Sequence, residues 1–205
     1  MKKLIQILLL IAVVALGYIL TMQILDPLNF VKERAAREAV VIERVKDIRT
    51  AQRAFKSVHQ NYSSNFEELI SFLENDSLVY DKVVGSFDDS LAVAKGLVRV
   101  EKFNVAVKDT IFGARKYTAE ALKAIDEIPY GNGAKFIMDA TSLVTESQVI
   151  VPVFECKAPY KTFLTGIDDQ ELINLIDDCI NVLNKYPGIK VGSLEQATND
   201  AGNWE

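Results

Sequence analysis

Few side chains in this sequence have catalytic potential. The 205 residues include one histidine, His59, and two cysteines, Cys156 and Cys179. Nucleophilic catalysis needs a nucleophile, a base and a group that orients the base, and the sequence offers no such set around these residues. We expect His59 to pack against neighbours or to cap a helix end, where a cation suits the unpaired carbonyl groups. We therefore expect no catalytic residues and no enzyme activity.

Paired acidic residues are the next candidates, because carboxylates bind metal ions. The pairs are Asp88–Asp89, Asp168–Asp169 and Asp177–Asp178. Calcium takes about six to eight oxygen ligands, usually from a loop with alternating acidic residues and a glycine, and none of the pairs has that spacing. Two pairs stand at expected helix starts, where carboxylates cap N–H groups. The ten glycines are scattered, so no phosphate-binding loop is present. We expect neither a metal site nor a cofactor.

Cys156 and Cys179 are also a candidate disulfide pair. One lies in an expected strand and the other in an expected helix, so the two side chains have the opportunity to meet. A loop of this length would contribute about 3 kcal/mol to stability in the chain-entropy model. Two buried free thiols are the alternative, because cysteine often packs as a small apolar residue.

An apolar N-terminal run must position everything that follows. Leu4 to Leu25 contains no charged residue, and its length as a helix is about 33 Å against a hydrocarbon core of roughly 30 Å. We expect a transmembrane anchor over 1–27. Lys2 and Lys3 precede the run and favour a cytoplasmic N-terminus, with the rest of the chain on the other side. A cleaved signal peptide is the alternative.

A long amphipathic helix is expected to follow. Pro27 predicts a break or kink where the chain leaves the membrane, and helix-like sequence resumes over about 30–58 within a stem at 28–62. One narrow stripe recurs in steps of four and three residues. It consists of Val41, Val45, Ile48, Gln52 and Phe55. The stripe either packs on its own domain or meets a partner helix in an oligomer.

Charge is unevenly distributed between the stem and the rest of the chain. Residues 32–56 hold eight basic and four acidic residues, whereas residues 57–205 hold thirteen basic and twenty-three acidic ones. The basic stem has three candidate surroundings: anionic lipid headgroups, an acidic face of a neighbouring copy, or solvent. The net charge of −5 argues against a nucleic-acid partner.

Four short helices are expected after the stem, and most have capping or stop signals. They cover about 65–75 opened by Ser64 and Glu67, 89–96 between Asp89 and Gly96, 118–127 before Pro129, and 168–186 opened by Asp168 and Glu171. These helices alternate with strand-like segments, which is typical of an α+β domain.

The strand-like segments predict a small antiparallel sheet. They lie at 97–107, 134–140 and 149–156. A phase switch of apolar residues at Glu101–Lys102 predicts a bulge or bend, and Pro152 predicts an edge position or a bulge. The expected fold class is therefore α+β: a transmembrane helix continuing into a long amphipathic helix, then a head of short helices and a small antiparallel sheet over 63–190. A polar tail over 191–205 follows, in which Trp204 indicates some docking.

Part of the stem resembles the type IV pilin and pseudopilin family. The residues concerned are Ile48–Phe55, followed by Asn61–Tyr62 and the short helix Phe66–Ile70. The resemblance implies a membrane-anchored assembly component with a helical stem and a globular head. The sequence departs from the family because it has no prepilin-peptidase site and no glutamate near the start of the apolar run. An orthodox, processed pilin is therefore not expected.

A second resemblance covers more of the chain. It rests on five segments: Ala94–Val98, Val107–Phe112, Val151–Glu155, Gly188–Gly192 and Gly202–Glu205. They are similar to segments of single-pass envelope proteins of Bacteroidota. The resemblance implies an inner-membrane anchor and a periplasmic domain, and it supplies no active site.

Together these observations predict a membrane-anchored, non-catalytic scaffold or assembly component of a cell-envelope complex. Its partners would be membrane lipid and other envelope proteins or copies of itself. A periplasmic binding or sensory domain held at the inner membrane is the alternative, and a closed apolar pocket with convergent polar groups would distinguish it. An envelope enzyme would instead need a polar cleft with perturbed carboxylates.

Overall fold

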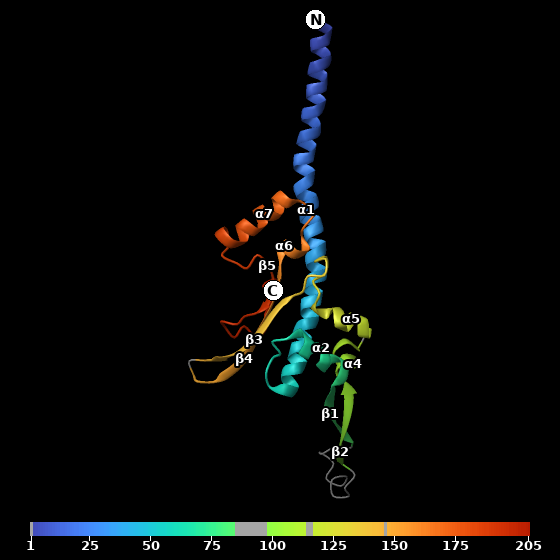
Figure 1. Cartoon of the computed structure of the whole chain (residues 1–205), viewed down its shortest axis with the longest axis vertical. Helices are drawn as coiled ribbons and strands as arrows, with labels where there is room; N and C mark the ends of the chain where they lie inside the picture. The colour runs from blue at the N-terminus through green and yellow to red at the C-terminus, as the bar shows by residue number, and fades with distance from the viewer. Residues whose placement is uncertain (1, 85–97, 114–116, 146) are drawn as a thin grey trace.

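The structure of the chain is a computed structural model that describes residues 2–84, 98–113, 117–145 and 147–205. A long helix carries an α+β head around its C-terminal half (Figure 1). The elements in chain order are α1 (Lys2–His59), α2 (Phe66–Asn75), β1 (Ser77–Val84), β2 (Arg99–Ala106), α4 (Val107–Phe112), α5 (Ala119–Lys123), the 3-10 turn η2 (Ala124–Asp126), β3 (Ile137–Val144), β4 (Ile150–Pro159), α6 (Tyr160–Phe163), α7 (Asp169–Asp177), the π-helical turn η3 (Asp178–Val182) and β5 (Gly188–Gly192). This confirms the expected fold class.

Helix α1 joins the apolar run and the stem without interruption. It is 58 residues long, and Pro27 lies inside it. Of the break or kink expected at Pro27, the break is therefore wrong. Proline removes one backbone hydrogen bond, but the helix continues through it, and Phe30, three residues later, is already buried in the core of the head. Among the described residues, α1 is the one helix long and apolar enough to span a membrane.

The stem stripe lies inside the core of the head. Val41, Val45, Ile48, Gln52 and Phe55 are all buried. The four apolar residues belong to a buried cluster that also includes Leu69 and Leu73 of α2 and Phe154 of β4. Gln52 is the one polar residue of the stripe, and it is buried as well. Of the two expected surroundings, the structure therefore shows packing on the stem's own domain. The C-terminal half of α1 is therefore the central helix of the head.

Two helices of the head, α2 and α5, begin at side-chain caps. Asn65 caps α2 by accepting a hydrogen bond from the backbone N–H of Glu67, so the expected cap at Ser64 is displaced by one residue. Thr118 caps α5 by accepting from the N–H of Ala121. These caps fix where each helix starts, and Leu69 of α2 and Leu122 of α5 are buried in the core of the head.

Strands β1 and β2 form an isolated antiparallel ribbon. The ribbon keeps one register from Ser77 opposite Ala106 to Val84 opposite Arg99, so the bulge expected at Glu101–Lys102 is wrong. Most residues on both faces of the ribbon are exposed, so its apolar residues are not confined to one face. Strand β1 is not foreseen from the sequence, and the helix expected at 89–96 lies outside the described residues.

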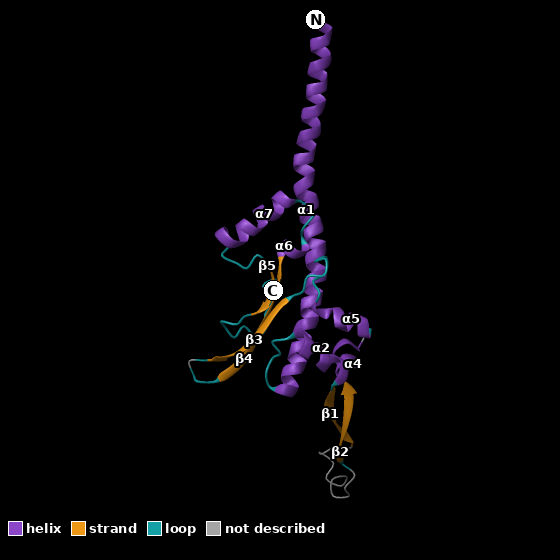
Figure 2. Cartoon of the chain, in the orientation of Figure 1, coloured by secondary structure: helices purple, strands orange, loops and turns teal. Residues whose placement is uncertain are grey.

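Strands β3, β4 and β5 form the second antiparallel sheet, with β4 in the centre. Strand β4 pairs with β5 only from Glu155 to Pro159. Pro152 lies opposite Ser142 of β3 in the part of β4 that has no second partner, which confirms its expected edge position. Figure 2 shows the β1–β2 ribbon and the β3–β4 hairpin apart from each other, both pointing away from the N-terminal end of α1.

The chain beyond residue 190 is docked and does not form a separate tail. Val191 and Gly192 are buried in β5, and Val191 also pairs with Gly202. Gly192 has φ +72°, and a Cβ there would lie 2.1 Å from the carbonyl oxygen of Phe154, so only glycine fits. The expected tail boundary at 191 is therefore wrong, because it divides strand β5.

Helix α7 begins where the sequence predicts and ends earlier. The Asp168 carboxylate accepts hydrogen bonds from the N–H groups of Gln170 and Glu171. The α-helix ends at Asp177 and continues as the π-helical turn η3 to Val182, short of the expected Tyr186. Helix α7 lies at the end of the head that is nearest to the N-terminal half of α1 (Figure 1).

Candidate functional site

The only histidine packs at the end of the stem. His59 is the last residue of α1, and its ring stacks on Phe55 with centroids 4.3 Å apart. The same ring meets Phe72 of α2 edge to face at 5.7 Å. The expected packing role of His59 is therefore confirmed.

The two cysteines are both free and buried, so the candidate disulfide is not formed. Cys156 lies in β4 between Met138 of β3 and Val191 of β5, whereas Cys179 lies in the turn η3 after α7. This arrangement does not bring the two sulfur atoms into bonding distance. Burial raises the pKa of the Cys156 thiol, and the nearby charge of Glu155 adds to the effect. Cys156 is thus held as a neutral thiol.

The acidic pairs serve the helices in which they lie. Asp168 caps α7, and Asp177 accepts a hydrogen bond of 2.6 Å from the side-chain amide of Asn181. Asp88 and Asp89 lie outside the described residues. Within the part of the chain that the structure describes, no three His, Cys, Asp or Glu side chains gather in a way that could hold a metal ion.

A row of arginines along α1 fastens the head to the stem. Arg34 donates to the hydroxyl of Tyr160 at 3.4 Å and lies over its ring. Arg37 donates to the carbonyl oxygen of Phe163 at 3.0 Å, and Arg44 to that of Ala124 at 2.6 Å. Charge-assisted hydrogen bonds of this kind are stronger than neutral ones. Several basic side chains of the stem therefore bond to the protein's own head.

Arginines nearer the C-terminal end of α1 hold residues 193–205, which we call the C-terminal segment. Arg49 donates to the backbone oxygen of Asp200 and to the carboxylate of Glu205, at 3.2 and 2.6 Å. Arg53 forms an ion pair of 2.9 Å with the Asp200 carboxylate. The guanidinium of Arg49 also lies over the ring of Trp204. These contacts explain why a polar segment is ordered against the stem.

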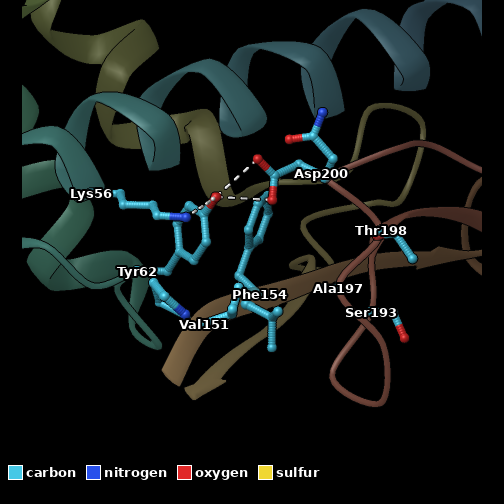
Figure 3. Close-up of a pocket in the computed structure, with 11 residues that line it drawn as sticks. Lys56, Tyr62, Val151, Phe154, Ser193, Ala197, Thr198 and Asp200 are labelled. Carbon is cyan, nitrogen blue, oxygen red and sulfur yellow. Dashed lines mark hydrogen bonds between the residues drawn. The ribbon is translucent and has the colours of Figure 1, made fainter. Parts of the chain in front are cut away.

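A small pocket lies between the stem, strand β4 and the C-terminal segment (Figure 3). Its volume is about 190 Å³. Tyr62 donates to both carboxylate oxygens of Asp200 at 2.9 Å, and Lys56 donates to the Tyr62 hydroxyl at 3.3 Å. Burial raises the pKa of Tyr62, and its hydrogen bond to Asp200 raises it further. The Lys56–Tyr62–Asp200 chain thus joins stem and C-terminal segment.

The pocket is better suited to holding the C-terminal segment against the stem than to binding a ligand. Ligand pockets are commonly about 300 to 1,000 Å³ in volume. The polar groups in this pocket already bond to one another, and the rings of Tyr62 and Phe154 pack beside them with centroids 4.8 Å apart.

A buried carboxylate joins strands β4 and β5 beside the same segment. Glu155 is buried and pairs with Lys157 of its own strand and with Lys190 of β5. Lys157 and Lys190 face each other in the β4–β5 register. Two cations around one buried carboxylate offset part of its desolvation. This cluster holds in place the strand from which the C-terminal segment begins.

Two exposed apolar hairpins remain as candidate contact surfaces. The β1–β2 ribbon exposes Val79, Tyr80, Val100 and Phe103. The tip of the β3–β4 hairpin exposes Val144, Val149 and Ile150. Exposed apolar residues gathered in this way mark surfaces for association. Sequence reasoning missed both surfaces. It expected a polar tail over 191–205 with some docking at Trp204, and the structure shows that the C-terminal segment is docked on the basic stem.

The geometry described above is the basis for the function that we propose. In comparisons with known proteins, the chain matches no protein-family model, no curated protein and no solved structure.

Proposed function

We propose that the protein is a membrane-anchored, non-catalytic scaffold or assembly component of a cell-envelope complex. The main support is helix α1. One helix carries an exposed apolar stretch at its N-terminal end and supplies the core of the head with its C-terminal half. A head fastened in this way has a fixed position relative to a membrane, which suits a scaffold. The resemblance of the stem to pseudopilins points the same way.

The proposed location is the inner membrane, with a cytoplasmic N-terminus and a periplasmic head. The support is the order of Lys2, Lys3 and the uncharged run that follows. Alkaline phosphatase fused after Glu205 should be active, because the enzyme folds only outside the cytoplasm. An inactive fusion, together with fluorescence from a reporter that functions only in the cytoplasm, would reverse the orientation.

The two exposed hairpins are the proposed contact surfaces for protein partners. Val79 and Val144 are 61% and 70% exposed. An isolated two-stranded ribbon is marginally stable in water, so a partner that covers the β1–β2 ribbon would stabilise it. Both hairpins point away from the N-terminal end of α1, where they are accessible to other envelope proteins (Figure 1).

A periplasmic binding or sensory domain is the second candidate, and the pocket beside Tyr62 is the observation that favours it. Its volume of about 190 Å³ and its internally bonded polar groups make it the weaker candidate. The scaffold proposal uses the larger exposed surfaces and needs no ligand.

Photocrosslinking in membranes tests the scaffold proposal. A photoreactive amino acid at Val79 or at Val144 should capture a protein. The same residue at Glu120, an exposed position on α5, is the matched control and should capture none. His59→Ala should leave the crosslinks unchanged. The proposal fails if neither hairpin position captures a protein although the chain accumulates normally. It also fails if His59→Ala abolishes the cellular function of the protein without changing its fold or its level.

A further inference from the structure

Three cations of α1 lie beside the C-terminal segment. Arg49, Arg53 and Lys56 follow one another in steps of four and three residues, which places them on one face of the helix. We call these three residues the basic ridge. Arg49 forms an ion pair of 2.6 Å with Glu205, and Arg53 forms one of 2.9 Å with Asp200. The C-terminal segment has three acidic residues and no basic one, so its charge complements that of the ridge.

The C-terminal segment also pairs with the outer edge of β5, the edge that does not face β4. The N–H of Asn203 donates to the carbonyl oxygen of Lys190 at 2.9 Å, and the N–H of Gly192 donates to that of Ala201 at 3.0 Å. The side-chain amide of Asn203 donates to the carbonyl oxygen of Gly188 at 2.8 Å. The end of the chain thus lies on the sheet like an added strand, which is a common mode of peptide recognition.

Little apolar surface holds the C-terminal segment in place. Among residues 193–205, all of which the structure describes, Gly202 is the one buried residue, and Trp204 is partly buried. Segments with few buried apolar contacts open locally at a lower free-energy cost than unfolding of the whole domain. Ion pairs between partly exposed side chains also weaken as the salt concentration rises. We therefore expect the segment to leave the basic ridge while the rest of the head stays folded.

The connection between β5 and the docked residues is short. Residues 193–197 form it, and most of them are exposed. The six Cα–Cα steps from Gly192 to Thr198 span at most about 20 Å, so a released segment reaches only a copy that stands directly beside its own. If α1 spans a membrane as proposed above, on which this inference rests, neighbouring copies stand parallel. Their basic ridges then lie at the same height above the bilayer, within reach of each other's segments.

We propose that the basic ridge and the outer edge of β5 form a docking site for the C-terminal segment of a second copy as well as for that of the same chain. Arg49 of one copy then pairs with Glu205 of the other. Each contact within a chain has an identical counterpart between chains, so the exchange needs no new surface and only the path of residues 193–197 changes. A neighbouring site within reach of the same tether has an effective concentration comparable to that of the site in its own chain. The exchange links adjacent copies, which gives the proposed scaffold a means of self-association.

Two full-length copies with reversed charges and different affinity tags test the exchange. One copy carries Arg49→Glu and the other carries Glu205→Arg, so each repels its own segment. In a mixed pair, each segment meets a site of opposite charge on the other copy. The two copies are produced together, collected with the membranes, solubilised in mild detergent and isolated by one tag. Two differently tagged copies that both carry Arg49→Glu are the matched control, because their segments are repelled within and between chains.

The mixed pair should co-purify about tenfold more strongly than the control pair, because like charges brought together at an interface are strongly unfavourable. High salt should reduce this difference. Equal co-purification of the two pairs would overturn the exchange. Recovery of the chain in the membrane fraction reads out the anchor separately. A chain that stays in the soluble fraction overturns the anchor, whereas a membrane-bound chain that does not pair overturns the exchange alone.

A photoreactive amino acid in place of Trp204 gives a second measurement that leaves every charge unchanged, and it decides the result if a charge-reversed copy fails to fold. The Trp204 ring centroid lies 5.9 Å from the guanidinium carbon of Arg49. Crosslinks between differently tagged copies should therefore map to the stem of the second copy near Arg49. The same amino acid at Glu120, an exposed position on α5, is the control and should link no second copy. Crosslinks confined to one chain, or equal capture from Glu120, would overturn the exchange.

Discussion

The side-chain amide of Gln52 bonds both backbone groups of Ser63. Its nitrogen donates to the carbonyl oxygen of Ser63 at 2.7 Å, and its oxygen accepts from the N–H of Ser63 at 3.0 Å. Both residues are buried. Ser63 lies in the connection between α1 and α2, so the one polar position of the stem stripe satisfies the backbone where the chain turns back on itself.

Gln52→Leu should lower the free energy of unfolding by about 2 to 4 kcal/mol. The substitution leaves the buried N–H and C=O groups of Ser63 without partners, and each such group costs about 1 to 3 kcal/mol. Chemical unfolding of the chain in detergent measures the change. Thr50→Ala, at an exposed position two residues away, is the control and should change stability little. Equal stabilities of the two variants would show that the Gln52–Ser63 pair contributes nothing.

Val45→Asp should destabilise the head by a few kcal/mol, because it places a carboxylate without a partner in the core. Val45 is fully buried, whereas Val40, on the same helix, is 44% exposed. Val40→Asp is therefore the matched control and should leave the melting temperature nearly unchanged. The core position of the stripe would be contradicted if both variants melted alike.

Glu205 should contribute to stability above about pH 4 and lose its contribution in acid. The hydrogen bond from Arg49 lowers the pKa of Glu205 below its usual range, and the backbone N–H of Gly202 adds to this. Because the folded-state pKa lies below the unfolded one, the contribution is complete above the unfolded pKa and disappears as the pH falls through the folded pKa.

Melting curves from pH 7 to pH 2 measure this effect. Glu205→Gln should melt below the wild type at pH 7, and the gap should close in acid. Glu195→Gln, at an exposed position in the same segment, should show no such pH-dependent gap. If the difference in melting temperature between Glu205→Gln and the wild type stayed constant from pH 7 to pH 2, the Arg49–Glu205 ion pair would not be its cause.

Cys156 and Cys179 should resist thiol reagents in the folded protein. Both are buried, and the raised pKa of Cys156 suppresses the reactive thiolate. Labelling should require denaturant, and a reductant should leave the melting temperature unchanged because no disulfide is present. Ser147→Cys, at an exposed position, should react at once and serves as the control. A melting temperature that falls when reductant is added would show that Cys156 and Cys179 are bonded to each other.

Local pattern was sufficient for the parts of the fold that depend on nearby residues. The apolar run, the spacing of Val41, Val45 and Ile48, and the cap at Asp168 are each recognisable within a few turns of chain. Helix periodicity and capping are local interactions, so the sequence alone determined that a stem with one buried stripe leads into an α+β head.

Tertiary structure alone decided what that stem touches. Arg49 bonds to Asp200 and Glu205, about 150 positions away along the chain, and Arg37 and Arg44 bond to backbone carbonyl groups of the head. Every residue has a carbonyl group, so no residue type marks such an acceptor in the sequence. The docking of the C-terminal segment and the placement of α7 at the end of the head nearest to the apolar half of α1 follow from these distant contacts, which exist only once the chain has folded.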